Sequence, residues 1–169
     1  MRVHVIVASR HDGTLEIART IGDVLAERGY ATDVTRLERD DAFDVEIGPD
    51  DAVVLGSAVY VGEWMGRAQR FVEQHADDLH GRPLWLFSSG AKHGADGAEV
   101  SDTWIDSLEA STDAMGHHLF LSRMDPSRLS FGERFVATNK QLPSGDFRDW
   151  DDIRAWANDI ADTLAAADN

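Results

Sequence analysis

Short apolar runs and longer amphipathic stretches alternate along the whole chain, and their spacing predicts the secondary structure. The apolar runs predict strands at residues 3–8, 31–37, 52–57, 84–87 and 118–121. Between and after them, apolar positions recur at helical spacing in residues 15–28, 64–79, 101–115 and 149–166. Gly29 is placed to end the first helix, and Asp149 is placed to cap the last one. Strands that alternate with helices in this way predict an α/β fold with a doubly wound parallel sheet covered on both faces.

The length of 169 residues, without repeats, linkers or low-complexity stretches, predicts one domain over residues 1–169. The chain has no cysteine, which excludes disulfides, thiolate metal sites and thiol nucleophiles. Electron transfer by this protein would therefore require a bound cofactor. No apolar run approaches the roughly 20 residues of a membrane span, and the N-terminus lacks a signal-peptide pattern, so a cytoplasmic location is expected.

Charge narrows the range of partners. The 31 acidic residues against 16 basic ones give a net charge of −15. Such a surface repels nucleic acids and anionic membranes. An anionic ligand would have to be attracted locally, because long-range steering has the wrong sign.

The first strand runs directly into a turn that could hold an anion. Ser9 and Thr14 bracket this turn, which contains Gly13 and is followed by the first helix. The backbone N–H groups at a helix start converge on one point and favour an anion there. The spacing matches neither the P-loop nor the dinucleotide glycine pattern. An ordinary strand-to-helix turn with Thr14 as the N-cap is the alternative.

Three charged or titratable side chains sit inside this turn. Arg10 and His11 could supply the local positive charge that an anion needs. Asp12 opposes an anion, unless its side chain turns outward or pairs with Arg10.

Two further segments follow the ends of neighbouring predicted strands, at residues 57–63 and 88–97. The carboxyl ends of parallel strands meet at one edge of the sheet, where ligands of such folds bind. Gly56 and its small neighbours would let the backbone approach a ligand, and Tyr60 and Trp64 could cover a flat ring. Each aromatic residue taken alone could equally be a packing residue. Together, the three segments favour a flavin.

The chain resembles flavodoxin-domain proteins, in particular the group that includes the menaquinone-dependent protoporphyrinogen oxidases. The resemblance spans nearly the whole chain and rests on ASRH at 8–11 with TLEIA at 14–18, VLGSAVY at 54–60, GRPLWLFSSG at 81–90 and GDFRDW at 145–150. It implies a flavodoxin-like three-layer sandwich with a five-stranded parallel sheet in the order 2-1-3-4-5. It also implies one non-covalently bound FMN and an FMN-dependent oxidoreductase activity.

The same resemblance implies which residues contact the cofactor. The phosphate would be held by the first loop: Ser9, Arg10, His11, Asp12, Gly13 and Thr14. The edges of the flavin ring would be lined by the second segment: Ser57, Ala58, Val59, Tyr60, Val61 and Gly62. The far side of the ring would meet the third segment: Ser88, Ser89, Gly90 and Gly94.

Residues 122–146 occupy the place of a segment that the protoporphyrinogen oxidases carry before the last helix. Residues 122–145 carry a net charge of +2 in an otherwise acidic protein. The resemblance implies a substrate such as protoporphyrinogen IX, a quinone acceptor, a role in haem biosynthesis, and a location that could be peripheral to the membrane. A segment that simply packs on the domain is the alternative. A non-enzymatic electron carrier with a redox partner protein, or a flavin-free interaction module, remains open for the whole chain.

Other candidate chemistry is weak. His117 and His118 are adjacent on a predicted strand, so their side chains point to opposite faces and cannot share a metal. No other cluster has metal-ligand spacing. The paired acids at residues 40–41, 50–51, 77–78 and 151–152 are expected on solvated surface or at helix starts.

Overall fold

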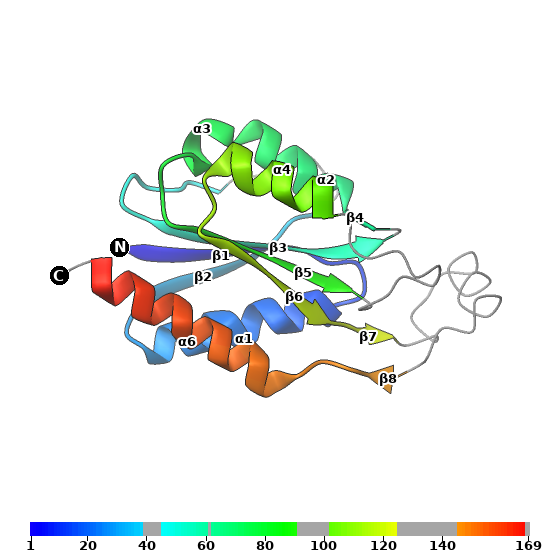
Figure 1. The fold of residues 1–169 in the computed structure, drawn as a ribbon. Coiled ribbons are helices and arrows are strands. Elements are labelled where there is room, and N and C mark those ends of the chain that lie inside the picture. Colours follow the sequence, from blue (N-terminus) through cyan, green and yellow to red (C-terminus); the bar gives the residue numbers. More distant parts are fainter. Residues whose placement is uncertain (39–44, 61, 91–101, 125–144, 168–169) are drawn as a thin grey trace.

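A twisted parallel sheet forms the centre of the computed structural model, which describes residues 1–38, 45–60, 62–90, 102–124 and 145–167 (Figure 1). Its strands follow the order β2-β1-β3-β5-β6. Their bounds are Arg2–Ala8 for β1, Ala31–Arg36 for β2, Ala52–Tyr60 for β3, Leu84–Gly90 for β5 and Gly116–Leu121 for β6. Numbered without the short hairpin strand β4, these strands have the order 2-1-3-4-5. The predicted fold and strand order are confirmed.

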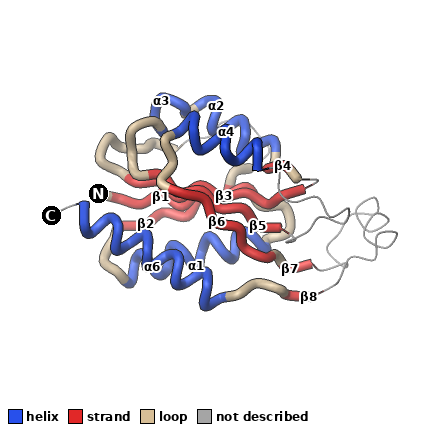
Figure 2. Tube along the Cα trace, in the orientation of Figure 1, coloured by secondary structure: helices blue, strands red, loops and turns tan. Residues whose placement is uncertain are grey.

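Helices cover both faces of the sheet (Figure 2). On one face lie α1 (Gly13–Glu27) and α6 (Trp150–Ala167), and their apolar sides share a core with residues of β1, β3 and β5. On the other face lie α2 (Gly66–Gln74), α3 (Ala76–Leu79) and α4 (Asp102–Thr112). Ile6, Leu55 and Leu86 point to this second core and are fully buried. The continuous apolar runs therefore reflect burial on both faces of the sheet.

Helix boundaries follow local backbone chemistry. Gly29 has φ 94°, a left-handed conformation that suits glycine just after a helix end. Asp149 caps α6, because its Oδ1 accepts the backbone N–H groups of Asp151 and Asp152 at 3.1 Å each. Both expectations are confirmed. Among the described residues, no helix is long and apolar enough to cross a membrane.

The helix predicted over residues 64–79 is confirmed only in part, because it is divided into α2 and α3 and begins two residues later than predicted. Glu63–Trp64 forms the short strand β4, which folds back antiparallel on the end of β3. Met65 then has an extended backbone with φ −59° and ψ 136°, and α2 begins only at Gly66. His75, with φ −113°, separates α2 from α3. The sequence did not reveal these breaks in the helix, because apolar residues recur at helical spacing across them. These residues all lie in the same core: Trp64, Ala68, Phe71 and Leu79.

A two-stranded antiparallel ribbon follows the central sheet. It consists of β7 (Arg123–Met124) and β8 (Gly145–Asp146). The segment predicted at residues 122–146 begins and ends close to this ribbon, and its residues 125–144 lie outside the described part of the chain. The ribbon lies near the start of α1, because Arg123 Nη1 is 3.6 Å from Glu16 Oε1.

Asp51 is not the solvated acid that its sequence pair suggested. Its carboxylate accepts the backbone N–H groups of Arg2 and Gly48 at 2.9 Å and lies 3.1 Å from His4 Nε2. Burial alone would raise the pKa of Asp51, but these hydrogen bonds outweigh it and the pKa is lowered. Asp51 thus fixes the start of β3 against the start of β1.

Candidate functional site

The ends of three adjacent strands bring the predicted segments together. Ala8 at the end of β1 pairs with Ser57 of β3, and Ser57 pairs with Ser88 of β5. The turn after β1 therefore lies beside the end of β3, as the sequence predicted. β3 and β5 continue further than expected, to Tyr60 and Gly90, so residues 57–60 and 88–90 are strand rather than loop.

The turn at residues 9–14 leads Ser9 into α1. Ser9 is 1% exposed, and its Oγ has no hydrogen-bond partner among the described residues. Asp12 occupies the N-cap position with φ 63°, a left-handed conformation, and its carbonyl accepts the N–H of Glu16 at 2.9 Å. Thr14 is buried inside the helix, so the alternative with Thr14 as N-cap is wrong. In an α-helix, the N–H groups of the first helical turn point toward the N-terminus, so those at the start of α1 face residues 9–14.

Asp12 does not cap the helix with its side chain. Its Oδ1 accepts a hydrogen bond from Arg36 Nη1 at 2.6 Å. The same guanidinium lies close to the Arg10 carbonyl, with Nη2 at 3.5 Å. The structure thus places the Asp12 carboxylate against Arg36 of β2, a partner that the sequence analysis did not suggest.

Two more arginines hold the backbone of this turn. Arg67 of α2 donates to the Ser9 carbonyl at 2.9 Å and to the Leu37 carbonyl at 2.9 Å. Arg148 donates to the Gly13 carbonyl at 3.2 Å. The sequence analysis predicted no role for Arg36, Arg67 or Arg148. Only the GDFRDW motif, which contains Arg148, pointed to one of them.

Arg148 is the most buried of these cations, with a side chain that is 2% exposed. Its guanidinium forms hydrogen bonds to Asp146 and to Glu16 Oε2, with 2.7 Å from Nε to Asp146 Oδ1 and 2.6 Å from Nη1 to Glu16. It also stacks over the Trp150 ring at 4.5 Å. The hydrogen bond to Asp146 is the main cause that raises the pKa of Arg148, and it lowers the pKa of Asp146.

The end of β3 and β4 form a hairpin. Gly62 has φ 81°, a conformation that favours glycine in its turn, and Val61 lies outside the described residues. Ser57 Oγ donates to the Ala58 carbonyl at 2.8 Å and accepts the Met65 N–H at 3.0 Å. The Ser57 hydroxyl therefore fixes the base of the hairpin.

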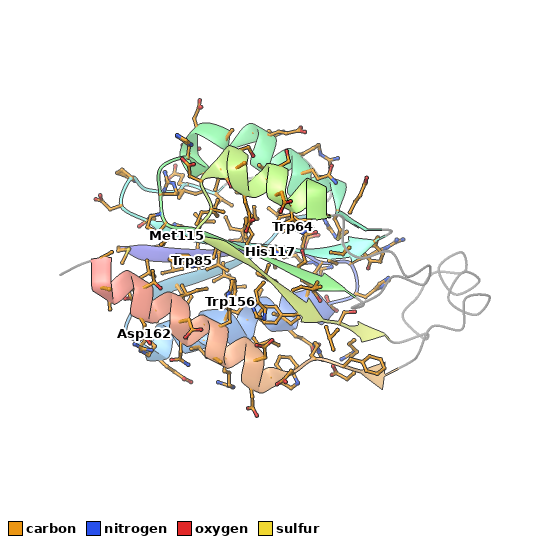
Figure 3. The ribbon with its side chains drawn as sticks, viewed as in Figure 1. Trp64, Trp85, Met115, His117, Trp156 and Asp162 are labelled. Carbon is orange, nitrogen blue, oxygen red and sulfur yellow. The ribbon has the colours of Figure 1, made fainter. Side chains whose placement is uncertain are left out.

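Trp64 is not placed to cover a flat ring. It is 2% exposed and belongs to the core under α2, where its Nε1 donates to Ser88 Oγ at 2.7 Å. Ser88 Oγ also lies 2.8 Å from His117 Nε2. Figure 3 labels Trp64 and His117, and it shows Trp156 on the α6 side of the sheet. Tyr60 is 38% exposed at the strand end, so of the two aromatic candidates it is the accessible one.

The serines at the strand ends divide into two kinds. The hydroxyls of Ser57 and Ser88 are engaged within the protein. Those of Ser9 and Ser89 are buried and lack a partner among the described residues. Gly94 lies outside the described part of the chain.

Two glycines, in β3 and β5, make room for neighbouring side chains. A Cβ on Gly56 would lie 2.0 Å from the Phe87 ring, so this glycine makes room for a core aromatic residue. A Cβ on Gly90 would lie 3.2 Å from Val59 Cβ. That Gly56 and its small neighbours let the backbone approach a ligand stays a prediction.

The two histidines of β6 diverge as predicted. His117 lies against Ser88, and His118 Nε2 lies 2.9 Å from Asp152 Oδ2 of α6 on the opposite face. The described residues contain no group of three or more side chains able to hold a metal ion.

Comparison with known proteins identifies the family. Residues 4–140 match the flavodoxin domain family, so the chain belongs to it. This family consists of FMN-binding proteins. No curated protein matches the sequence.

Solved structures share the fold. A flavodoxin from the domain Archaea has a TM-score of 0.65 at 13% identity, with 98% of this chain and 99% of that chain covered. The flavodoxin of Streptococcus pneumoniae TIGR4 has a TM-score of 0.60 at 20% identity, with 99% of each chain covered. Rubredoxin oxygen:oxidoreductase from Desulfovibrio gigas has a TM-score of 0.62 at 11% identity, over 98% of this chain and 36% of that one. The fold therefore occurs both as a whole flavodoxin and as part of a larger oxidoreductase.

Proposed function

We propose that this chain is an FMN-binding electron carrier of the flavodoxin type. Membership of the flavodoxin family supports the cofactor. The site is assigned from the buried Ser9 hydroxyl beside the start of α1, which has no hydrogen-bond partner in the part of the chain that the structure describes. A buried hydroxyl without a partner is costly unless a ligand satisfies it. A phosphate at this helix start would do so.

In this proposal, residues 9–14 bind the phosphate. Ser9 Oγ and the N–H groups of Gly13 and Thr14 donate to it, and Arg10 and His11 supply positive charge. FMN, when bound, supplies the capacity to accept and release electrons. The protein's own residues hold the phosphate, orient the ring and limit its contact with water.

The flavin ring would lie along the ends of β3 and β5. Tyr60 would cover one side of it, next to Ala58, Val59, Val61 and Gly62. Ser89, with its buried hydroxyl, would face the ring together with Gly90 and Gly94. Ser57 and Ser88 would act indirectly, because their hydroxyls hold the hairpin and Trp64 in place.

Family membership and the neighbouring structures support a carrier. The chain belongs to the flavodoxin domain family, and the structures that share its fold include flavodoxins. Flavin binding and electron transfer by the purified protein test this proposal. The protein supplied with FMN should show a flavin absorption spectrum at one FMN per chain, and after anaerobic reduction it should pass electrons to a generic acceptor such as a cytochrome c. A folded protein that retains no flavin would instead be a flavin-free interaction module.

Oxidation of protoporphyrinogen IX with a quinone acceptor is the second candidate function. The β7–β8 ribbon supports it, because the ribbon includes Arg123 of the basic segment, and Arg123 lies next to Gly13 and Glu16 at the start of α1. The assay is turnover of protoporphyrinogen IX with menaquinone analogues by the FMN-loaded protein. Turnover above the rate of free FMN would favour the enzyme. A turnover rate equal to that of free FMN would leave the electron carrier as the proposed function.

A further inference from the structure

Two acids lie in or next to the loop proposed to bind the FMN phosphate. Asp12 stands at the N-cap of α1, and Glu16 lies in its first turn. The phosphate of FMN is a dianion at neutral pH, so each carboxylate repels it. At a separation of several ångströms, such repulsion in a partly solvated site is large enough to change affinity about tenfold per charge. For this loop to bind the phosphate, the negative charge of these carboxylates must be offset by nearby positive charge.

Arg36 supplies it for Asp12. The guanidinium comes from the last residue of β2, whose backbone pairs with Val7 just before the loop. Its Nη1 donates to Asp12 Oδ1 at 2.6 Å, and its Nη2 lies 3.5 Å from the Arg10 carbonyl. The side chains of Arg36 and Asp12 are 28% and 46% exposed, so water and salt screen part of the interaction between them.

Glu16 is compensated from the other side. Arg148 Nη1 donates to Glu16 Oε2 at 2.6 Å, and Arg123 Nη1 lies 3.6 Å from Glu16 Oε1. Arg123 belongs to β7 and Arg148 follows β8, so both are far from the loop in sequence. Each of the two acids thus contacts an arginine from a distant part of the chain.

We propose that Arg36 is a positioning residue for FMN binding, which acts through Asp12: it neutralises this carboxylate and holds it so that the loop accepts a phosphate dianion. Arg148 has the same role toward Glu16. The inference rests on the proposed function, because it assigns the phosphate of FMN to this loop. It differs from a direct contact, in which Arg36 would bind the phosphate itself.

The test is a double-mutant cycle on Arg36 and Asp12, read by the dissociation constants of FMN and of riboflavin, which lacks the phosphate. Arg36→Gln should weaken FMN binding about tenfold and leave riboflavin binding unchanged. Asp12→Asn should leave FMN binding equal or tighter. The double variant should return to within about threefold of the wild type, because the loop carboxylate that Arg36 neutralises is then absent. The weakening by Arg36→Gln should also shrink at 1 M salt, a concentration chosen for the assay because it screens exposed charges.

Asn is the right replacement at position 12. Asp12 has φ 63°, a conformation that asparagine tolerates and glycine prefers. Asp12→Gly would change backbone strain and charge together. Arg36→Lys keeps the charge without the planar guanidinium group, so this variant should bind FMN within about threefold of the wild type. It can be used if Arg36→Gln fails to fold.

Arg2→Gln is the matched control. It removes the same charge from an ion pair with Asp33 at the opposite end of β1, and it should leave FMN affinity unchanged.

Three results would overturn the inference. The first is an FMN affinity unchanged by Arg36→Gln. The second is a double variant as weak as Arg36→Gln alone, which would make Arg36 a direct phosphate ligand. The third is equal weakening of FMN and riboflavin binding. Failure of the wild type to bind FMN at all would refute the proposed function instead, so the two failures are distinguishable.

Discussion

Replacement of Arg148 by methionine tests whether the buried cation joins the C-terminal part of the chain to the start of α1. The Arg148 side chain is 2% exposed, and it holds Asp146, Glu16 and the Gly13 carbonyl at once. Methionine keeps most of the buried aliphatic volume and removes only the guanidinium. The change therefore isolates the polar contacts.

The magnitude follows from the surroundings of the two acids. Removal of one partner of a fully buried ion pair costs about 3–5 kcal/mol. Here Glu16 is 35% exposed and Asp146 is 41% exposed, so both carboxylates regain water when the guanidinium is lost. We expect Arg148→Met to lower the free energy of unfolding by about 2–3 kcal/mol. For a domain of this size, that corresponds to a fall in Tm of roughly 4–12 °C.

The pH dependence gives a second signature. Hydrogen bonding to Arg148 lowers the pKa of Asp146 in the folded protein below its unfolded value, which is about 3.9. A depressed carboxyl pKa contributes stability that is fully present above the unfolded pKa and is lost as pH falls through the folded pKa. The difference between wild type and Arg148→Met should therefore be constant from about pH 5 to 8 and narrow below about pH 4.

The assay is urea unfolding of both proteins across this pH range, analysed with a shared m-value. Arg28→Met is the control, because it removes an arginine whose ion pair with Asp162 is exposed, at 37% and 67% for the two side chains. It should cost no more than about 0.5 kcal/mol. A loss below about 0.5 kcal/mol for Arg148→Met at pH 7, or a gap that does not narrow in acid, would refute the reasoning.

Three further predictions concern the core, the start of β3 and the charge of the protein. Gly56→Ala should cost more than about 2 kcal/mol in urea unfolding, because its Cβ would lie 2.0 Å from the Phe87 ring; a neutral effect would contradict this packing, and Phe87→Leu should restore part of the loss. Asp51→Asn should cost about 1–2 kcal/mol at pH 7 and progressively less as pH falls below about 4, since the pKa of Asp51 is lowered by its hydrogen bonds; an unchanged Tm at pH 7 would contradict this. The association rate of FMN, measured by stopped-flow fluorescence, should rise with salt because a net charge of −15 repels a dianion; a rate that falls with salt would show local attraction to dominate.

Hydrophobic patterning predicted the sheet well, because burial on both faces leaves a strong local signal. The runs at residues 3–8, 52–57 and 84–87 mark the three central strands, and the strand order followed from the resemblance. Boundaries were predicted less well. β3 and β5 extend past Ser57 and Ser88, since ladder hydrogen bonds continue into residues that read as loop.

The candidate site shows where a sequence pattern stops being informative. The approach of the three strand ends was predicted, because it depends only on parallel topology. The partner of Asp12 was not, because Arg36 is 24 residues away and reaches it only through the pairing of β2 with β1. Ser57 Oγ is engaged, whereas Ser9 Oγ has no partner within the described ranges, and this difference depends on side-chain packing that no spacing encodes.

Titration of the flavin-free protein with FMN, followed by flavin fluorescence, tests the central claim most directly. The account predicts saturable binding at one FMN per chain, with a dissociation constant on the order of micromolar or tighter and weaker binding of riboflavin. Absence of saturable binding up to about millimolar FMN, in a protein that is folded by circular dichroism, would contradict it.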